Sequence, residues 1–491
     1  MTFYVTTTIP YVNGRPHLGH ALELVQADAL ARHRRRRGDR VRFLSGTDDN
    51  SLKNVLAAQA EGVPTAQLVD RNAAVFAALH GPLSLSFDDF IRTSRDPRHR
   101  PGVERLWRAC AAAGDLYRKH YTGRYCVGCE QFYPPAELPD GRCPEHGTEP
   151  VPVAEENWFF RLSRYQDRLY QLISDGTLRI EPAARRNEVL AFIAGGLADF
   201  SISRSRERAR GWGIPVPDDP GQVVYVWWDA LGNYLSALDY GGDAAAYRDW
   251  WLGADRRVHL VGKGVLRFHA VYWPAMLLSA GVPLPTDVLV HDYLTVDGRK
   301  LGKSTGNGID PVDLVGRFGT DAVRWWLLRE VPRVGDADFT VDRLVARADE
   351  DLANGIGNLV NRVVSMVHRY RDGVVPAGPV RGTLSALADA VPGQVDAALA
   401  DFDLRRATVA IGHLVEAANR HVEQVRPWEL ARDPGAATRL DAELAVLVAA
   451  CRRVGEELAP FLPDGAVRIT RQCTPVGDRL PDPEPLFARL R

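Results

Sequence analysis

The alternation of strand-like and helix-like segments near the N-terminus constrains the fold more than any other feature of the sequence. Short apolar runs at residues 3–8 and 41–45 alternate with stretches of helical periodicity at residues 20–37 and from residue 51 onward. This order is typical of βαβ units, whose strands lie parallel in one sheet. Four further segments of the same kind follow, at residues 223–228, 258–262, 268–279 and 288–290. We therefore predict an α/β fold with a doubly wound parallel sheet and a ligand at the carboxyl ends of its strands.

A segment rich in turn residues interrupts this pattern between residues 117 and 150. It contains two pairs of metal-ligand side chains, each pair enclosing two residues: Cys126 and Cys129, then Cys143 and His146. Two such turns can place four ligands tetrahedrally around Zn²⁺. Because protein would fill all four positions, we predict one structural Zn²⁺ per chain. The alternative, unrelated buried thiols, fits the paired spacing less well.

Beyond residue 341 the strand pattern fades and long amphipathic stretches follow. These stretches are residues 344–371, 384–400, 407–425 and 440–458, joined by links rich in glycine and proline. Apolar residues at helical spacing over such lengths predict a helix bundle.

Charge and hydropathy limit the possible partners. The 61 basic residues balance 62 acidic ones, so any contact with nucleic acid needs a local basic surface. No apolar stretch approaches the roughly twenty residues of a transmembrane helix, and the N-terminus lacks a signal-like pattern. Only one cluster of cysteines is present, which argues against a disulfide framework. We expect a cytoplasmic protein without a membrane partner.

Two short segments carry residues suited to nucleotide chemistry. Residues 10–20 lie between the first strand and the first helix, where backbone N–H groups and the helix dipole favour a phosphate. His17 and His20 share one face of the first helical turn, so both imidazoles can face the same phosphate. In a second, glycine-containing segment, the ammonium groups of Lys300 and Lys303 could contact a polyphosphate. Together the segments predict a nucleotide-activating site.

These two segments resemble the HIGH and KMSKS motifs of class I aminoacyl-tRNA synthetases, and the surrounding sequence narrows the resemblance to the methionyl-tRNA synthetase family. Further matching segments are residues 46–49, 126–146, 155–160, 201–204, 212–217, 224–227, 268–269, 427–428 and 484–487. The resemblance implies a Rossmann-like sheet split by a zinc-knuckle insertion and followed by an α-helical anticodon-binding bundle. The domains it implies are two catalytic halves at 1–116 and 216–290, the insertion at 117–215, a KMSKS-like loop and linker at 291–340, and the anticodon-binding domain at 341–491.

The resemblance also implies an activity. A monomeric methionine–tRNA ligase would use ATP and Mg²⁺ to convert methionine to methionyl-adenylate and would transfer it to the 3′ end of tRNA(Met). His17 and His20 would donate hydrogen bonds to the α-phosphate, Gly19 would leave room for adenine, and Lys300 and Lys303 would stabilise the departing pyrophosphate. The ATP-binding residues implied are Gly19, Arg204, Lys300, Lys303 and Ser304.

The methionine and anticodon sites are implied by the resemblance alone. Aromatic walls suit a polarizable thioether, and Asp48 would bind the α-ammonium group. The implied methionine-binding residues are Ile9, Tyr11, Asp48, Trp227, Ala230, Leu231, Tyr234, Phe268 and His269. The implied anticodon-binding residues are Asn358, Arg362, Pro427 and Trp428.

The chain departs from the family pattern near the ATP site. The departures are Asn50 and Ser51 for a His-Gly pair, Gly264 for an aspartate, Asp292 for a glycine, and Gly302 in the KMSKS-like segment. One hypothesis is that Asp292 replaces the carboxylate missing at position 264. The competing hypothesis is that this additional acid repels the triphosphate, so that the enzyme is slow or repurposed. Two alternative functions stay open: a paralogue that activates a different amino acid for a biosynthetic pathway, and a tRNA-binding protein without catalysis.

Overall fold

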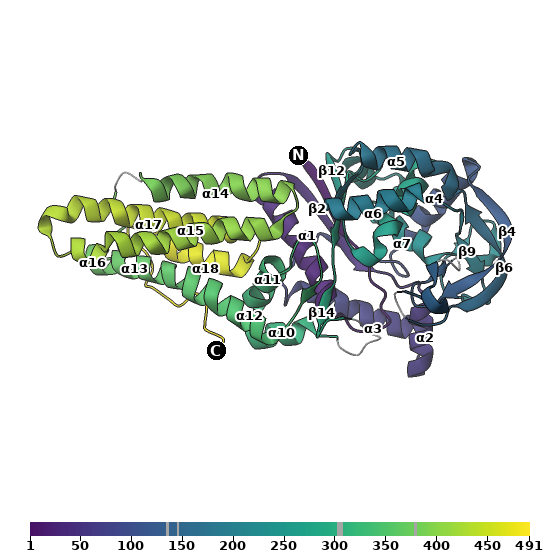
Figure 1. Cartoon of the computed structure of the whole chain (residues 1–491), viewed down its shortest axis with the longest axis horizontal. Helices are drawn as coiled ribbons and strands as arrows, with labels where there is room; N and C mark the ends of the chain where they lie inside the picture. Colours follow the sequence, from purple (N-terminus) through teal and green to yellow (C-terminus); the bar gives the residue numbers. More distant parts are fainter. Residues whose placement is uncertain (134–136, 145–146, 302–307, 378–380) are drawn as a thin grey trace. The chain divides into compact units, whose positions relative to one another are not determined.

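The computed structural model describes residues 1–133, 137–144, 147–301, 308–377 and 381–491 (Figure 1). The chain forms two compact units. The first unit comprises residues 1–27, 38–80 and 86–291, and the second comprises residues 28–37, 81–85 and 292–491.

A six-stranded parallel sheet forms the centre of the first unit, in the order β3-β2-β1-β12-β13-β7. Its strands are β1 (Thr2–Thr7), β2 (Arg40–Thr47), β3 (Asp89–Arg92), β7 (Arg179–Glu181), β12 (Arg256–Gly262) and β13 (Asp287–His291). The chain extends from β1 through β2 to β3 and later adds β12 on the other side of β1. This is the doubly wound order predicted from the sequence, and it puts the topological switch point between β1 and β12.

The first unit also contains helices, several of which supply large apolar side chains to the core of this sheet. They are α2 (Leu52–Glu61), α3 (Thr65–Ala77), α4 (His99–Ala112), α5 (Gln166–Ser174), α6 (Ala183–Ala194), α7 (Val226–Ser236), α8 (Ala245–Tyr247) and α9 (Trp273–Ala280), with the π-helical segments η6 (Arg248–Leu252) and η8 (Phe268–Tyr272). Trp228, Trp251 and Trp273 are fully buried in the same apolar cluster as Tyr4 of β1. Strands buried on both faces explain the continuous apolar runs of the sequence.

Between β3 and β12 the chain leaves the parallel sheet and forms an antiparallel sheet in the order β5-β4-β6-β8. Its strands are β4 (Leu116–Cys126), β5 (Gln131–Tyr133), β6 (Val151–Phe160) and β8 (Phe200–Ser201). A second, three-stranded sheet follows, made of β9 (Ser203–Ser205), β10 (Pro215–Val216) and β11 (Asp219–Val224). The sequence indicated only turns in the part of this region before residue 150.

The second unit is mainly helical, as predicted (Figure 1). Its helices are α10 (Pro311–Phe318), α11 (Thr320–Arg329), α12 (Val341–Arg347), the π-helical η9 (Ala348–Gly357), α13 (Asn358–Arg371), α14 (Thr383–Ala400), α15 (Leu404–Val425), α16 (Pro427–Leu430), α17 (Ala437–Leu458) and α18 (Pro463–Cys473). A small sheet in the order β15-β14-β16 contains β14 (Leu294–Val296), β15 (Arg299–Lys300) and β16 (Ala337–Asp338). In the part of the chain described, no helix has the length and apolarity needed to cross a membrane.

Candidate active site

The turn between β1 and α1 (Leu18–Arg36) places His17 and His20 side by side at the first helical turn. Their ring centroids are 3.9 Å apart. A β-carbon added at Gly19 would lie 2.9 Å from Cε1 of His17, so the imidazole of His17 occupies the space that glycine leaves. A glycine between the two histidines therefore permits their close approach.

Local hydrogen bonds determine which ring nitrogen carries the proton in each of these histidines. Nδ1 of His17 accepts the backbone N–H of Gly19 at 3.1 Å. Nδ1 of His20 accepts the backbone N–H of His17 at 3.0 Å. In the neutral imidazoles this assigns the proton to Nε2, so Nε2–H is the donor of each ring. Two such donors at a helix N-terminus suit an anionic ligand.

Glu23 fixes the helix to the end of β1 within the first unit. Its Oε1 accepts the backbone N–H of Thr8 at 2.6 Å, and its Oε2 lies 3.0 Å from Nε2 of His291 at the end of β13. Glu23 thereby joins the first turns of α1 to the carboxyl ends of two parallel strands. In this fold, ligands bind at that edge of the sheet.

The implied methionine-binding residues include an aromatic group on two helices. α7 carries Trp227, Ala230, Leu231 and Tyr234 at positions i, i+3, i+4 and i+7, which share one face of a helix. The rings of Trp227 and Phe268 stack with centroids 3.8 Å apart and an angle of 9°. The ring of Tyr11, in the turn after β1, faces the ring of Trp227 edge-on, with the ring centroids 6.4 Å apart.

His269 is joined to this aromatic group by a hydrogen bond to Tyr234, whose direction follows from its other hydrogen bond. Nδ1 of His269 lies 2.9 Å from the carbonyl oxygen of Val265 and donates to it, so Nε2 accepts the hydroxyl of Tyr234 at 2.7 Å. Burial lowers the pKa of His269 from 6.5 to about 4, although the bond to Val265 acts in the opposite direction. The imidazole is therefore neutral at physiological pH.

We expect His269 to make the protein less stable as the pH falls from 6.5 toward 4. The folded-state pKa lies below that of the unfolded chain, so the unfolded state binds the proton first and stability rises with pH across this window. The full effect corresponds to ~3 kcal/mol of unfolding free energy, of which about 2 kcal/mol is lost by pH 5. Denaturant unfolding at pH 7 and pH 5 measures this loss in the parent protein and in His269→Gln, whose glutamine cannot titrate. Equal losses in parent and variant would contradict the assignment.

Asp48 lies directly after β2, and its backbone N–H donates to the carbonyl oxygen of Pro10 at 3.0 Å. The side chain is buried. Burial and the nearby carboxylates of Asp229, Glu130 and Asp49 raise the pKa of Asp48 well above its usual range. A cation bound among these groups would be stabilised electrostatically.

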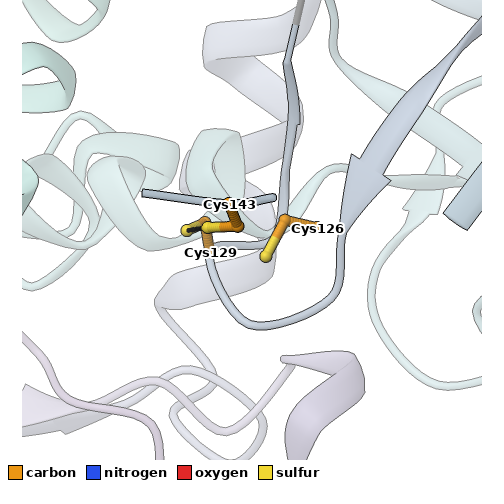
Figure 2. Close-up of side chains that lie close together, drawn as sticks. All are labelled: Cys126, Cys129 and Cys143. Carbon is orange, nitrogen blue, oxygen red and sulfur yellow. Dashed lines mark hydrogen bonds between the residues drawn. The ribbon is translucent and has the colours of Figure 1, made fainter. Parts of the chain in front are cut away.

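Three cysteines form a candidate metal site in the insertion (Figure 2). The Sγ atoms of Cys126, Cys129 and Cys143 all lie within 4.8 Å of one another, with Cys129 and Cys143 3.4 Å apart. A tetrahedral zinc site with Zn–S bonds of ~2.3 Å would separate its sulfurs by ~3.8 Å, so the three thiols fit a metal ion with little movement. The fourth expected ligand, His146, lies outside the described residues.

Of the KMSKS-like segment, only the first two residues are described. Lys300 is the last residue of β15, and its Nζ lies 3.6 Å from the ring centroid of Tyr293. Lys303, Ser304 and the substituted Gly302 fall outside the described residues. Asp292 is buried and accepts a hydrogen bond from the backbone N–H of Gly335 at 2.5 Å, which gives its carboxylate a role in the fold of the second unit.

A groove of about 610 Å³, lined by residues with polar side chains, lies in the second unit and contains two of the implied anticodon-binding residues. It is lined by Asn354, Asn358, Arg362, Glu416, Asn419, Arg420, Glu423 and Gln424. Arg362 donates to Oε1 of Glu423 at 2.6 Å across the groove. Pro427 begins α16 and is buried, and the half-buried Trp428 follows it. Amide and guanidinium groups on an open surface can read the edges of unstacked bases.

Sequence reasoning missed several polar groups of these sites. The buried guanidinium of Arg204, an implied ATP-binding residue, donates to Oε2 of Glu130 at 2.6 Å, and Glu130 carried no prediction. His99 and Asp229 form a second buried pair. Their partners are distant in sequence, so no local pattern could identify them. Of these residues, only Glu130 could have been singled out by its position in the sequence, because it directly follows Cys129.

Comparison with known proteins gives consistent matches along the chain. A family model described as "tRNA synthetases class I (M)" matches residues 3–149 and 134–364. A methionine–tRNA ligase from Brucella suis is 41% identical over 515 residues, covering 99% of this chain and 98% of that protein. A methionine–tRNA ligase from Caldanaerobacter subterraneus is 40% identical over 476 residues, covering 96% of this chain and 74% of that protein. The structure of Mycobacterium tuberculosis methionyl-tRNA synthetase in complex with methionyl-adenylate matches with a TM-score of 0.93 and 39% identity, covering 99% of this chain and all (100%) of the other.

Proposed function

Because this chain belongs to the methionine–tRNA ligases of the class I tRNA synthetases, we propose that it activates methionine with ATP and transfers the methionyl group to tRNA(Met). The observation that carries the proposal is the match, over nearly the whole chain, to a synthetase structure that holds methionyl-adenylate. Methionyl-adenylate forms from ATP and methionine. The paired histidines at the start of α1 are suited to ATP, and the aromatic group on α7 and η8 is suited to methionine.

In the first step, the methionine carboxylate attacks the α-phosphorus of ATP, the bond to the β-phosphate oxygen breaks, and pyrophosphate leaves. The Nε2–H groups of His17 and His20 donate to the α-phosphate oxygens as their charge grows. Asp48 holds the α-ammonium, and Lys300 with Lys303 binds the departing pyrophosphate. Mg²⁺ that accompanies ATP neutralises phosphate charge. In the second step, a 3′-terminal ribose hydroxyl of tRNA attacks the methionyl carbonyl carbon and AMP leaves.

The cysteine cluster supports a structural Zn²⁺ held by Cys126, Cys129 and Cys143, with His146 as the fourth ligand. Soft sulfur ligands on two tight turns favour this metal. We also propose that the enzyme is monomeric and cytoplasmic.

Pyrophosphate exchange with each of the twenty amino acids tests the proposed function. We expect exchange with methionine alone, and aminoacylation of a tRNA with a CAU anticodon. Exchange with a different amino acid would instead support a biosynthetic paralogue. No exchange, together with binding of tRNA, would support a non-catalytic tRNA-binding protein.

We expect Arg362→Ala and Trp428→Ala to lower kcat/KM for tRNA charging by about 10- to 100-fold each, because stacking or hydrogen bonding to one base contributes ~1–3 kcal/mol. Methionine-dependent pyrophosphate exchange does not need tRNA and is expected to stay unchanged. Arg369→Ala provides the matched control, since Arg369 is exposed on the same helix and does not line the groove. Equal effects of Arg362→Ala and Arg369→Ala on charging would contradict the assignment of the groove.

A further inference from the structure

The loop at residues 48–51 connects β2 to α2 and contains two of the departures from the family pattern. Asp48, Asp49 and Ser51 are buried. The backbone N–H of Asn50 donates to Oδ1 of Asp48 at 3.1 Å, and Nδ2 of Asn54 donates to the carbonyl oxygen of Asp48 at 3.0 Å. These two bonds fix Asp48 from within its own segment.

Asn50 also connects the loop to α7. Its Nδ2 donates to Oδ2 of Asp229 at 2.8 Å. The other oxygen of Asp229 lies 2.5 Å from Nε2 of His99, whose Nδ1 lies 2.8 Å from Oγ of Ser236. Asp229, His99 and Ser236 are all at least 99% buried, so Asn50 is attached to a rigid polar chain inside the core. α7 is the helix that carries Trp227 and its aromatic neighbours.

Ser51 connects the loop to the metal-binding insertion. Its Oγ donates to Oε1 of Glu130 at 2.6 Å and accepts the backbone N–H of Lys53 at 3.0 Å, as the N-cap of α2. Oε2 of Glu130 accepts from Tyr125 at 2.8 Å and from Arg204 at 2.6 Å. The carboxylate that receives Ser51 is therefore fixed by Tyr125 and by an ion pair with Arg204.

The charges around the loop favour a bound cation. Glu130 is paired with Arg204, and Asp49 is paired with Arg92 at 3.0 Å. Within the described residues, the partners of Asp48 and Asp229 include no lysine or arginine. An α-ammonium group could supply the missing positive charge.

We propose that Asn50 and Ser51 are positioning residues that hold the Asp48 carboxylate in place for the α-ammonium group of methionine. This inference rests on the proposed function. Asn50 anchors the loop to α7, and Ser51 anchors it to Glu130. A glycine at position 51, as in the family pattern, has no hydroxyl and could not reach Glu130. Anchoring the loop before substrate binds avoids the cost of ordering it on binding.

The test uses Asn50→Ala, Ser51→Gly and the double variant in methionine-dependent pyrophosphate exchange. We expect each single variant to raise the KM for methionine about tenfold, as expected for a lost hydrogen bond to a charged group, while kcat and the KM for ATP change less than about twofold. Ser51→Gly is preferred to alanine because glycine is nearly as good an N-cap. Thr340→Gly, at the N-cap of α12, is the matched control for a lost capping side chain.

A pair of inhibitors isolates the contact with the ammonium group. L-Methioninol and 4-(methylthio)butan-1-ol differ only by the amino group. The variants are expected to weaken inhibition by L-methioninol about tenfold and to leave inhibition by the second compound unchanged. An unchanged KM for methionine, or equal rises in both KM values, would overturn the inference. A parent enzyme that shows no exchange with methionine would instead overturn the proposed function.

Discussion

Replacing His20 with alanine is expected to lower kcat for methionine-dependent pyrophosphate exchange by about 10²- to 10³-fold, because it removes one preorganised donor to the α-phosphate. Nδ1 of His20 already accepts the backbone N–H of His17, so Nε2–H is held in a fixed direction before ATP binds. Such a donor acts mainly on charge that develops in the transition state. We therefore expect the KM for methionine to change less than about threefold. Steady-state exchange assays with each substrate varied in turn measure both quantities.

His17→Ala is expected to give a loss of similar size, and the double variant a loss smaller than the product of the two. Both rings face each other at 3.9 Å and would act on one phosphate, so their effects are not independent. His120→Ala is the control, because His120 is exposed in the insertion. A loss below tenfold in His20→Ala would mean that this turn does not stabilise the transition state.

The central sheet could be predicted from the sequence because its strands are buried on both faces. Val5 pairs with Phe43 on one side and with Val258 on the other, and all three are buried. Continuous apolar runs between helical segments are the expected signature of such strands. The long strands β4 and β6 gave no such signal, since most of their side chains up to residue 156 are exposed or half-buried. Their pairing had to be seen in the structure.

Local spacing singled out candidate site residues that are close in sequence, whereas it could not reveal contacts between residues that are far apart in sequence. His17 and His20 are three residues apart, and Cys126 and Cys129 are too. In contrast, Asn50 bonds to Asp229 across 179 residues, and Ser51 bonds to Glu130 across 79. Contacts at such separations are set by the order of strands in the sheet and not by local spacing. The residues on α7 illustrate a second limit, since the same spacing serves an apolar core and a substrate pocket equally well.

Removal of the proposed Zn²⁺ is expected to destabilise the insertion strongly. The apolar cluster around the cysteines is small and consists of Cys126, Tyr133, Leu138 and Cys143, with Cys129 packed against it. Such a core cannot offset the conformational entropy of the loops that carry it, whereas structural Zn²⁺ contributes ~10–16 kcal/mol in small zinc-binding peptides. We expect Cys143→Ser to bind less than about a tenth of an equivalent of zinc and to be cleaved rapidly by protease between residues 127 and 147.

The loss is expected to extend to methionine activation, because the cysteine loop contacts the aromatic group directly. Nε1 of Trp227 lies 3.5 Å from the carbonyl oxygen of Cys129, and Glu130 directly follows this cysteine. Displacement of the loop would move both groups, so we expect the KM for methionine to rise at least about tenfold in Cys143→Ser. Cys110→Ala is the matched control: Cys110 is buried in the main core of the first unit, outside the cysteine cluster, and its loss should leave one zinc per chain. If Cys143→Ser lost its zinc but kept the parent KM for methionine, the metal would stabilise only the insertion. The contact between Trp227 and Cys129 would then have no part in binding methionine.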